Sequence, residues 1–374
     1  DQLPSVEAGA VLGDLIPRTG EPTFSTSFAA ELSELTPGEP LSASLEEAGG
    51  DLTDRVVLLS RSNRSAGAIY QAAQAMNAGL LSLPRELPRL VPERTVAAGG
   101  HAGAADRGVF SVNWDRAEGT CALINPGHRG IGPLRDVLSS WVENDLTGGE
   151  DGAPGVRGAT SRTFPEELLV AGGTPPEALR HLLQHYDRSR ILTPLRRGPY
   201  GCEGINAYLA TVLRRRFDPQ GPPVVFAGAP IVVTRNAPRR GLFNGDTGFV
   251  VRAASGRRFG VFGRGREFIA LPVNLLPEHE SAFALTVHRS QGSEYERVLL
   301  VLPPDRGHPL LTREILYTAV TRAKRVAVVY GTPEVLRTAI ATRIVRLSGL
   351  DLWATGDRPG TQTGAMREGE LPGP

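Results

Sequence analysis

Hydrophobic and polar positions alternate with two different periods along the chain, and each period predicts a different kind of element. Short β-branched and aliphatic runs predict buried strands at 55–60, 190–195, 282–287, 297–302 and 326–331. Apolar residues at helical spacing predict helices at about 28–35, 68–79, 133–146, 175–186, 312–324 and 333–348. Because strand and helix signals follow one another repeatedly, the pattern indicates an α/β fold.

The pattern changes between residues 222 and 278. Short β-type runs are separated there by Gly, Asn and Pro, and Asn244-Gly245-Asp246 predicts a tight turn. This texture predicts a compact β-subdomain, separable from the α/β core. Residues 84–131 show little periodicity, and 148–161 read as a flexible surface loop.

Composition limits the class of protein. With 40% hydrophobic and 22% charged residues, the 374-residue chain has the composition of a soluble globular protein with two or three domains. No apolar run is long enough to cross a bilayer, so we expect no membrane contact. Two cysteines form neither a disulfide framework nor a zinc cluster, which favours a reducing, cytoplasmic setting. Since the net charge is +1, any site for a polyanion must be local.

Polar residues gather directly after the strand at 282–287. They are Thr286, His288, Ser290, Gln291, Gly292 and Glu294. The carboxyl ends of strands are where α/β sheets bind ligands, so this loop is a candidate site. The alternative is a polar connection between two strands.

A second candidate lies at the end of the helix at 312–324. Thr321 and Arg322 fall in its predicted last turn, just before a strand, and a guanidinium there would match phosphate oxygens. The alternative is that Arg322 and Lys324 complement the negative end of the helix.

Taken together, the two segments resemble motifs V and VI of superfamily 1 DNA helicases. The motif V pattern comprises Thr286, His288, Ser290, Gln291, Gly292, Glu294 and Tyr295, and the motif VI pattern comprises Tyr317 to Ala323. "LLSRSNRSAGAI" at 58–69 resembles motif IV, with Arg64 as its phosphate-contacting arginine and Asn63 where the family usually has an aromatic residue. "DQLPSVEAG" at 1–9 resembles the second half of motif III, whose γ-phosphate-sensing Gln corresponds to Gln2. The branch that these segments resemble is the RecD family, the alpha subunit of exonuclease V.

The resemblance implies a RecA-like helicase fold with an inserted SH3-like β-barrel. The expected divisions are the end of a first RecA-like domain with a linker at 1–54, a second RecA-like domain at 55–221 and 279–350, the barrel at 222–278, and a disordered tail at 351–374. The resemblance also implies that the chain starts inside motif III of a longer protein.

The same resemblance implies roles for individual residues. Gln2, Arg64 and Arg322 would act on ATP, and Gly292 and Glu294 would also contact the nucleotide. Thr286, His288 and Ser290 would contact DNA. No metal ligand is expected in this chain, since the family's Mg²⁺ ligands belong to a part that the sequence does not contain.

The implied activity is that of an ATP-dependent 5′–3′ DNA helicase subunit. Its implied partners are single-stranded DNA, duplex ends, RecB and RecC. No G-x-x-x-x-G-K-[ST] phosphate loop occurs in the sequence, so we expect this chain alone to lack ATPase activity. The alternatives are a truncated module that binds DNA or a subunit, and a stand-alone RecD-like helicase. Arginines at 196–197, 214–216 and 239–240 are further candidates for phosphate contacts, although 214–216 also fits a solvated helix face.

Overall fold

The computed structural model describes residues 24–35, 54, 67–95, 109–127, 130–147 and 155–344, except for the side chains of 93–95, 109–111 and Asp115. The predicted strand at 55–60, the site residues Gln2 and Arg64, and the tail at 351–374 lie outside these residues.

The described residues fall into two units. In the smaller one, helix α2 (Thr26–Leu35) confirms the helix predicted near 28–35. The backbone N–H of Ser25, just before it, donates to a carboxylate oxygen of Asp54 at 2.6 Å. The larger unit comprises the described residues from 67 to 344.

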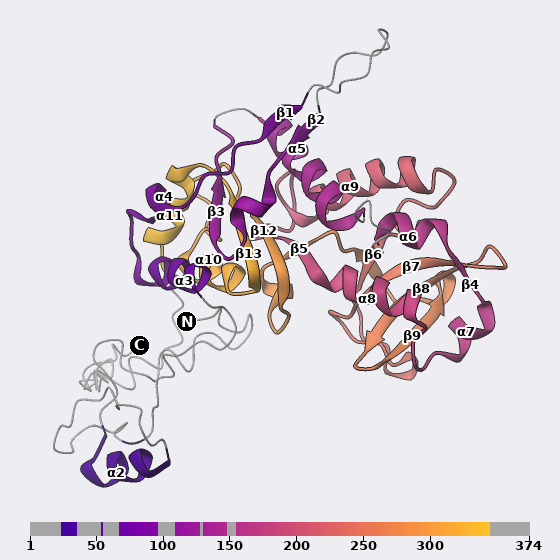
Figure 1. The fold of residues 1–374 in the computed structure, drawn as a ribbon, viewed down its shortest axis with the longest axis horizontal. Coiled ribbons are helices and arrows are strands. Elements are labelled where there is room, and N and C mark those ends of the chain that lie inside the picture. The colour runs from indigo at the N-terminus through magenta and orange to yellow at the C-terminus, as the bar shows by residue number, and fades with distance from the viewer. Residues whose placement is uncertain are drawn as a thin grey trace, which may run out of the picture. The chain divides into compact units, whose positions relative to one another are not determined.

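A five-stranded parallel sheet forms the core of the larger unit (Figure 1). Its strands, in spatial order, are β11 (Ala284–Thr286), β5 (Ser189–Thr193), β12 (Tyr295–Val301), β13 (Ala323–Tyr330) and β3 (Cys121–Ile124). The sheet is buried on both faces, because neighbouring residues of one strand enter different core clusters: Leu299 and Val301 one, Val298 and Leu300 the other. The four predicted strands within the described residues are confirmed.

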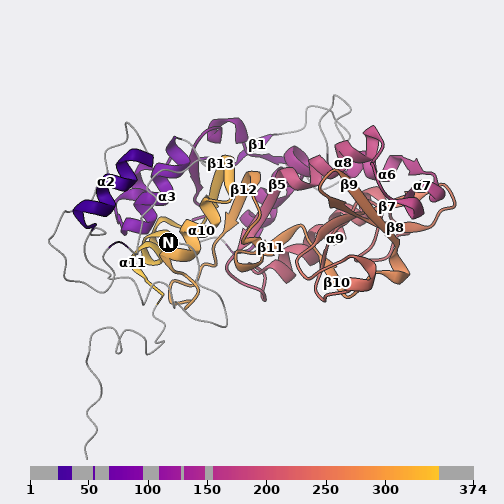
Figure 2. The same ribbon diagram turned by 90° about the horizontal axis from the view of Figure 1, so that it is seen from below.

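Helices cover both faces of this sheet (Figures 1 and 2). One face carries α3 (Ala68–Ala78), α10 (Arg313–Val320) and α11 (Pro333–Ala341). The other carries α5 (Gly132–Trp141), which continues as a π-helix at Val142–Leu146, α8 (Glu177–Arg188) and α9 (Cys202–Phe217). The helix predicted at 68–79 is confirmed, and Gly79 caps α3 in the left-handed conformation at φ +79°.

A second, antiparallel sheet is built between β5 and β11 along the chain. Its strand order is β10 (His279–Ser281), β6 (Pro230–Val233), β7 (Thr247–Ala253), β8 (Arg258–Arg264) and β9 (Glu267–Pro272). The β-rich character predicted for 222–278 is confirmed, as is the turn at Gly245, where φ is +96°. The sheet exceeds the predicted boundaries, because β10 ends at Ser281 and the short β4 (Thr163–Phe164) pairs with β7. Closure into an SH3-like barrel stays a prediction.

The separability expected of this sheet stays a prediction. Most of its buried apolar residues belong to the same core cluster as α5, α8 and one face of the parallel sheet, and Val232 of β6 belongs to the cluster on the other face. The rings of Tyr186 on α8 and Phe249 on β7 stack at 4.4 Å between centroids, and the Tyr186 hydroxyl donates to the Gly228 carbonyl at 2.6 Å. The two sheets therefore share one hydrophobic core.

Two segments read as irregular contain ordered elements. The stretch 84–131 supplies β3 and the smaller elements α4 (Leu83–Glu86), β1 (Glu93–Thr95), β2 (Val109–Ser111) and a 3-10 turn (Trp114–Ala117). The supposed loop at 148–161 ends in α6 (Val156–Ser161), followed by α7 (Glu166–Ala171). Strand β3 has only four residues, too few to show a period, yet all four are buried.

Candidate functional site

The loop between β11 and β12 starts at the carboxyl edge of the parallel sheet, at the end of β11, and runs to the amino end of β12. It begins with a 3-10 turn (His288–Ser290), and the Val287 N–H ties it to the Thr193 carbonyl of β5 at 3.0 Å. Gly292 then adopts φ +83°, a backbone conformation that residues other than glycine rarely take. The predicted candidate loop is thus a defined turn beside two strand ends, where α/β sheets hold ligands.

The three predicted DNA contacts take different positions in this loop. Thr286 and His288 are half-buried, and the Thr286 hydroxyl accepts from the Arg289 N–H at 3.4 Å. Ser290 is fully buried, and its hydroxyl donates to the Val287 carbonyl at 2.7 Å. The contact of Ser290 with DNA stays a prediction, and in this structure its hydroxyl is turned inward to the loop's own backbone.

Motif VI lies directly against this loop. The Arg322 guanidinium donates from Nε to the Thr318 carbonyl and from Nη1 to the Ser293 carbonyl, each at 3.2 Å. The Arg322 carbonyl in turn accepts from the Tyr295 N–H at 2.8 Å. Residues that are about thirty positions apart in the sequence are thus hydrogen-bonded into one unit.

Arg322 differs from its prediction in two respects. Helix α10 ends at Val320, so Arg322 lies in the turn beyond it and not in its last turn. A guanidinium that binds phosphate oxygens must be accessible, but Arg322 is only 1% exposed. Because it binds a carbonyl of the last turn of α10, the geometry agrees with the alternative in which it complements the helix end. Lys324 does not share that role, since its ammonium pairs with Glu294 at 3.4 Å.

The predicted nucleotide contacts include both exposed and buried residues. Gly292 and Glu294 are exposed just before β12, whereas Arg322, just before β13, is buried. Gln2 and Arg64 fall outside the described residues.

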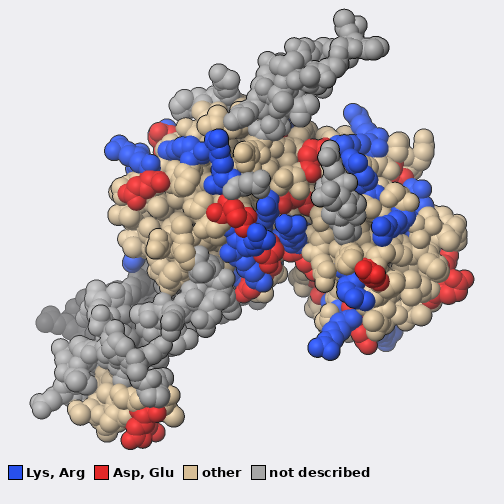
Figure 3. All heavy atoms as spheres, viewed as in Figure 1, with Lys and Arg blue, Asp and Glu red and all other residues tan. Residues whose placement is uncertain are grey.

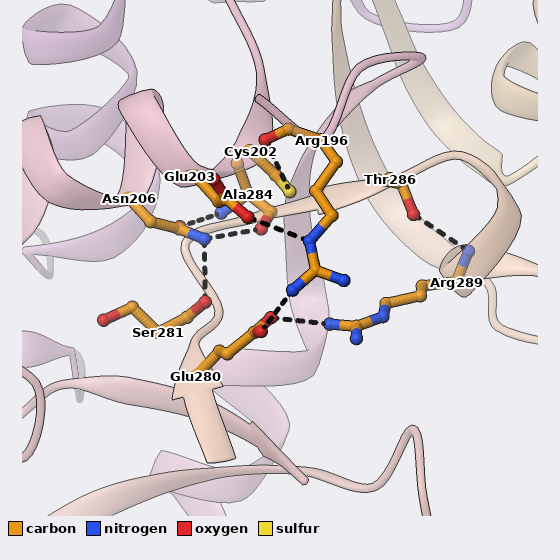
Figure 4. Close-up of polar contacts among 9 residues, drawn as sticks. All are labelled: Arg196, Cys202, Glu203, Asn206, Glu280, Ser281, Ala284, Thr286 and Arg289. Atoms are coloured by element: carbon orange, nitrogen blue, oxygen red, sulfur yellow. Dashed lines mark hydrogen bonds and ion pairs between the residues drawn. The ribbon is translucent and has the colours of Figure 1, made fainter. Parts of the chain in front are cut away.

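The loop after β5 forms the other part of this edge (Figure 4). It turns back into α9 through hydrogen bonds from the Cys202 N–H to the Leu195 carbonyl and from the Glu203 N–H to the Arg196 carbonyl, each 3.0 Å. Gly201 is required here, because a Cβ at this position would lie 2.3 Å from the Arg197 carbonyl oxygen. The turn brings the Arg196 guanidinium to the carboxylates of Glu203 and Glu280, both at 2.8 Å.

Asn206 is a positioning residue that the sequence did not reveal. From the buried face of α9, its amide donates to the carbonyls of Ser281 and Ala284 at 2.7 and 3.0 Å. Its side-chain oxygen accepts from the Ala284 N–H at 2.7 Å. These three bonds hold the start of β11, and hence the loop that follows (Figure 4). The available signal was a lone Asn on the apolar side of a helix, in "CEGINAYL".

The charges at this edge are balanced and not uniformly basic. The hydrogen bond to Glu203, followed by the charge of Glu280, raises the pKa of Arg196, so its guanidinium stays cationic. Burial raises the pKa of the Cys202 thiol, which keeps it neutral beside these residues. Figure 3 shows basic and acidic side chains close together on the viewed face of the described residues.

Comparison with known proteins supports the resemblance to helicases. The UvrD-like helicase C-terminal domain family matches residues 281–330, which include both motif segments. The RecD subunit of the RecBCD enzyme from Haemophilus influenzae is 36% identical over 169 residues, covering 44% of this chain and 25% of the relative. The RecD subunit from Mycobacterium tuberculosis H37Rv is 35% identical over 201 residues, covering 54% of this chain and 34% of the relative.

Over the matched residues the chain is similar to RecD-type helicases of superfamily 1. A further relative, the ATP-dependent RecD2 DNA helicase from Deinococcus radiodurans, is 37% identical over 141 residues, which cover 36% of this chain and 19% of that protein. The chain spans only 25% of the length of the Haemophilus RecD subunit and 34% of the length of the Mycobacterium one. Within the described part of this chain, no helix is both long and apolar enough to cross a membrane.

Proposed function

We propose that the chain contributes the second motor domain of an ATP-dependent DNA helicase that moves 5′ to 3′ on single-stranded DNA. The observation that carries this proposal is the hydrogen bonding of motif VI to the motif V loop, through Arg322 to Ser293 and Tyr295 to Arg322. The same loop begins at Thr286, the predicted DNA contact, and ends at Glu294, the predicted nucleotide contact. Because this loop is short and hydrogen-bonded to motif VI, a displacement at one of its ends is transmitted to its other end.

ATP with Mg²⁺ is the cofactor in this proposal, and its hydrolysis supplies the free energy for movement along DNA. Gly292 and Glu294 suit a nucleotide contact, because both are exposed in the loop just before β12 begins. Gln2 and Arg64 are assigned to the γ-phosphate region by resemblance alone. The buried guanidinium of Arg322 does not fit direct contact with a phosphate as it stands, so its role as an arginine finger also rests on the resemblance.

The proposed partners are DNA and, by analogy with the named relatives, the RecB and RecC subunits in the cytoplasm. The RecD relatives are subunits of the RecBCD enzyme, whereas the Deinococcus relative is named as a helicase in its own right. A stand-alone helicase is therefore the alternative for the assembly. Co-purification of the chain with RecB and RecC separates the two.

Unwinding by the full product of the gene that encodes residues 1–374 tests the proposed activity. We expect ATP-dependent unwinding of a duplex with a 5′ single-stranded tail and none of the matched duplex with a 3′ tail. Unwinding from the 3′ tail would overturn the polarity. Binding of both substrates without unwinding would favour a DNA-binding module that does not use ATP.

A further inference from the structure

Three segments bring two arginines onto one carboxylate at the site edge (Figure 4). Arg196 comes from the loop after β5, Glu280 from β10 of the antiparallel sheet, and Arg289 from the motif V turn. Nη2 of Arg196 lies 2.8 Å from Oε1 of Glu280, and Nη1 of Arg289 lies 2.9 Å from Oε2. Each carboxylate oxygen thus accepts from a different guanidinium.

Two guanidiniums repel each other unless an anion lies between them. The position of the Glu280 carboxylate therefore marks a place where the fold holds a single negative charge shared over two oxygens. A phosphodiester carries the same charge on two unesterified oxygens, and the guanidinium fork matches phosphate as well as carboxylate. The two guanidiniums that bind the Glu280 carboxylate are therefore also placed to bind one backbone phosphate of a nucleic acid.

The three side chains are accessible to such a ligand. The side chains of Arg196, Glu280 and Arg289 are 57%, 37% and 30% exposed. Exposed ion pairs of this kind contribute little to stability, so an incoming anion can replace the carboxylate at small cost.

The surroundings of the three side chains also favour a nucleic-acid phosphate. The backbone N–H of Arg289 donates to the hydroxyl of Thr286, the predicted DNA contact, at 3.4 Å. The amino terminus of α9, a helix of 16 residues, begins at Cys202 beside Arg196 and directs the positive end of its dipole toward this edge.

We propose that Arg196 and Arg289 form a binding site for one phosphodiester of single-stranded DNA, and that Glu280 occupies this site until the phosphate replaces it. The inference rests on the proposed function, because it requires DNA to cross this edge of the sheet. Glu280 then lowers the affinity of the free protein for DNA and keeps both guanidiniums in place for the phosphate.

Binding of a fluorescent oligodeoxythymidylate to the 374-residue chain, followed by anisotropy at several NaCl concentrations, tests the proposal. We expect Arg196→Ala and Arg289→Ala each to weaken binding roughly three- to tenfold and to reduce the slope of log K against log salt by about 0.7. Glu280→Gln should strengthen binding several-fold, a gain that misfolding cannot produce. The matched controls are Arg162→Ala, an exposed arginine before β4, and Glu278→Gln, an exposed glutamate near Glu280; both should bind like the unsubstituted chain.

The outcomes separate this inference from the proposed function. If the unsubstituted chain binds the oligonucleotide but the two arginine variants behave like Arg162→Ala, the phosphate site is overturned and the proposed function stands. Unchanged or weaker binding by a folded Glu280→Gln variant would overturn the role of Glu280. If the unsubstituted chain does not bind the oligonucleotide, both the proposed function and this inference fail.

Discussion

Arg322 shows how a residue expected at a ligand site can also be part of the protein interior. Its guanidinium bridges the end of α10 to the motif V loop, through the carbonyls of Thr318 and Ser293. A buried cation that donates to two backbone carbonyls stabilises the local fold and, at the same time, holds motif VI against motif V.

Replacing Arg322 by Ala should therefore destabilise the protein. We expect a loss of about 2–3 kcal/mol in the free energy of unfolding, because two carbonyls lose a donor and the side chain leaves a buried space. Lys324→Ala is the matched control: its pair with Glu294 is largely exposed, so the loss should stay below about 1 kcal/mol. Urea denaturation of both variants measures the difference, and equal stabilities would contradict the buried bridge.

At the residue scale the sequence predicted which side chains lie together but not which way they face. The motif pattern grouped Thr286, His288, Gly292 and Glu294, and in the structure one loop joins them, from the end of β11 to the start of β12. The orientation of Ser290 and Arg322 depends on which backbone carbonyls come within hydrogen-bond reach after folding, and no linear pattern contains that information. The ion pairs of Glu280 escaped detection for the same reason, since its partners come from two other segments.

Among the elements, α9 and β11 are joined by a single side chain. Asn206 satisfies the carbonyls of Ser281 and Ala284 and the N–H of Ala284, at the point where the antiparallel sheet passes into the parallel one. The position of the motif V loop therefore depends on a residue of a different helix.

Asn206→Ala should lower the free energy of unfolding by about 2–4 kcal/mol, because it leaves buried backbone groups without partners. It should also weaken binding of single-stranded DNA, since the loop after β11 loses its anchor. Thr211→Ala on the same helix provides the comparison, because the Thr211 hydroxyl only bonds back to the Ala207 carbonyl of its own helix at 2.8 Å. If both variants melted at the same temperature and bound DNA equally well, Asn206 would have no positioning role.

Long periodic segments were predicted well and short buried ones were not. Helix α8 and strand β12 carry enough apolar positions to show their period, and both were predicted near their observed bounds. Strand β3 has four residues and α6 has six, fewer than a period requires, and both are held by tertiary packing. Element length, more than composition, decided which parts of the fold the sequence revealed.

At the scale of the whole molecule, the two sheets share one core despite their different sequence textures. The change of sequence pattern at residue 222 predicts a domain boundary, but such a pattern reflects the spacing of apolar residues in strands and not which apolar faces pack together. Phe249 of the antiparallel sheet stacks on Tyr186 of α8, so the packing crosses that boundary.

Phe249→Ala should destabilise both sheets together by about 3–5 kcal/mol, since it removes a fully buried ring from the shared core. Amide hydrogen exchange should accelerate in β5 and β12 as well as in β7. Phe243→Ala serves as the control, because this ring is 50% exposed in a loop of the same sheet and its loss should cost less than about 1 kcal/mol. Faster exchange confined to β7 would show that the antiparallel sheet unfolds by itself.

The central claim is that motifs V and VI connect a DNA contact with an ATP contact through one hydrogen-bonded loop. The rate of ATP hydrolysis by the full gene product, with and without a saturating single-stranded oligonucleotide, tests it most directly. The account predicts that the oligonucleotide raises kcat by roughly tenfold or more, equivalent to about 1.4 kcal/mol of transition-state stabilisation. A kcat that stays the same while the oligonucleotide is bound would contradict it.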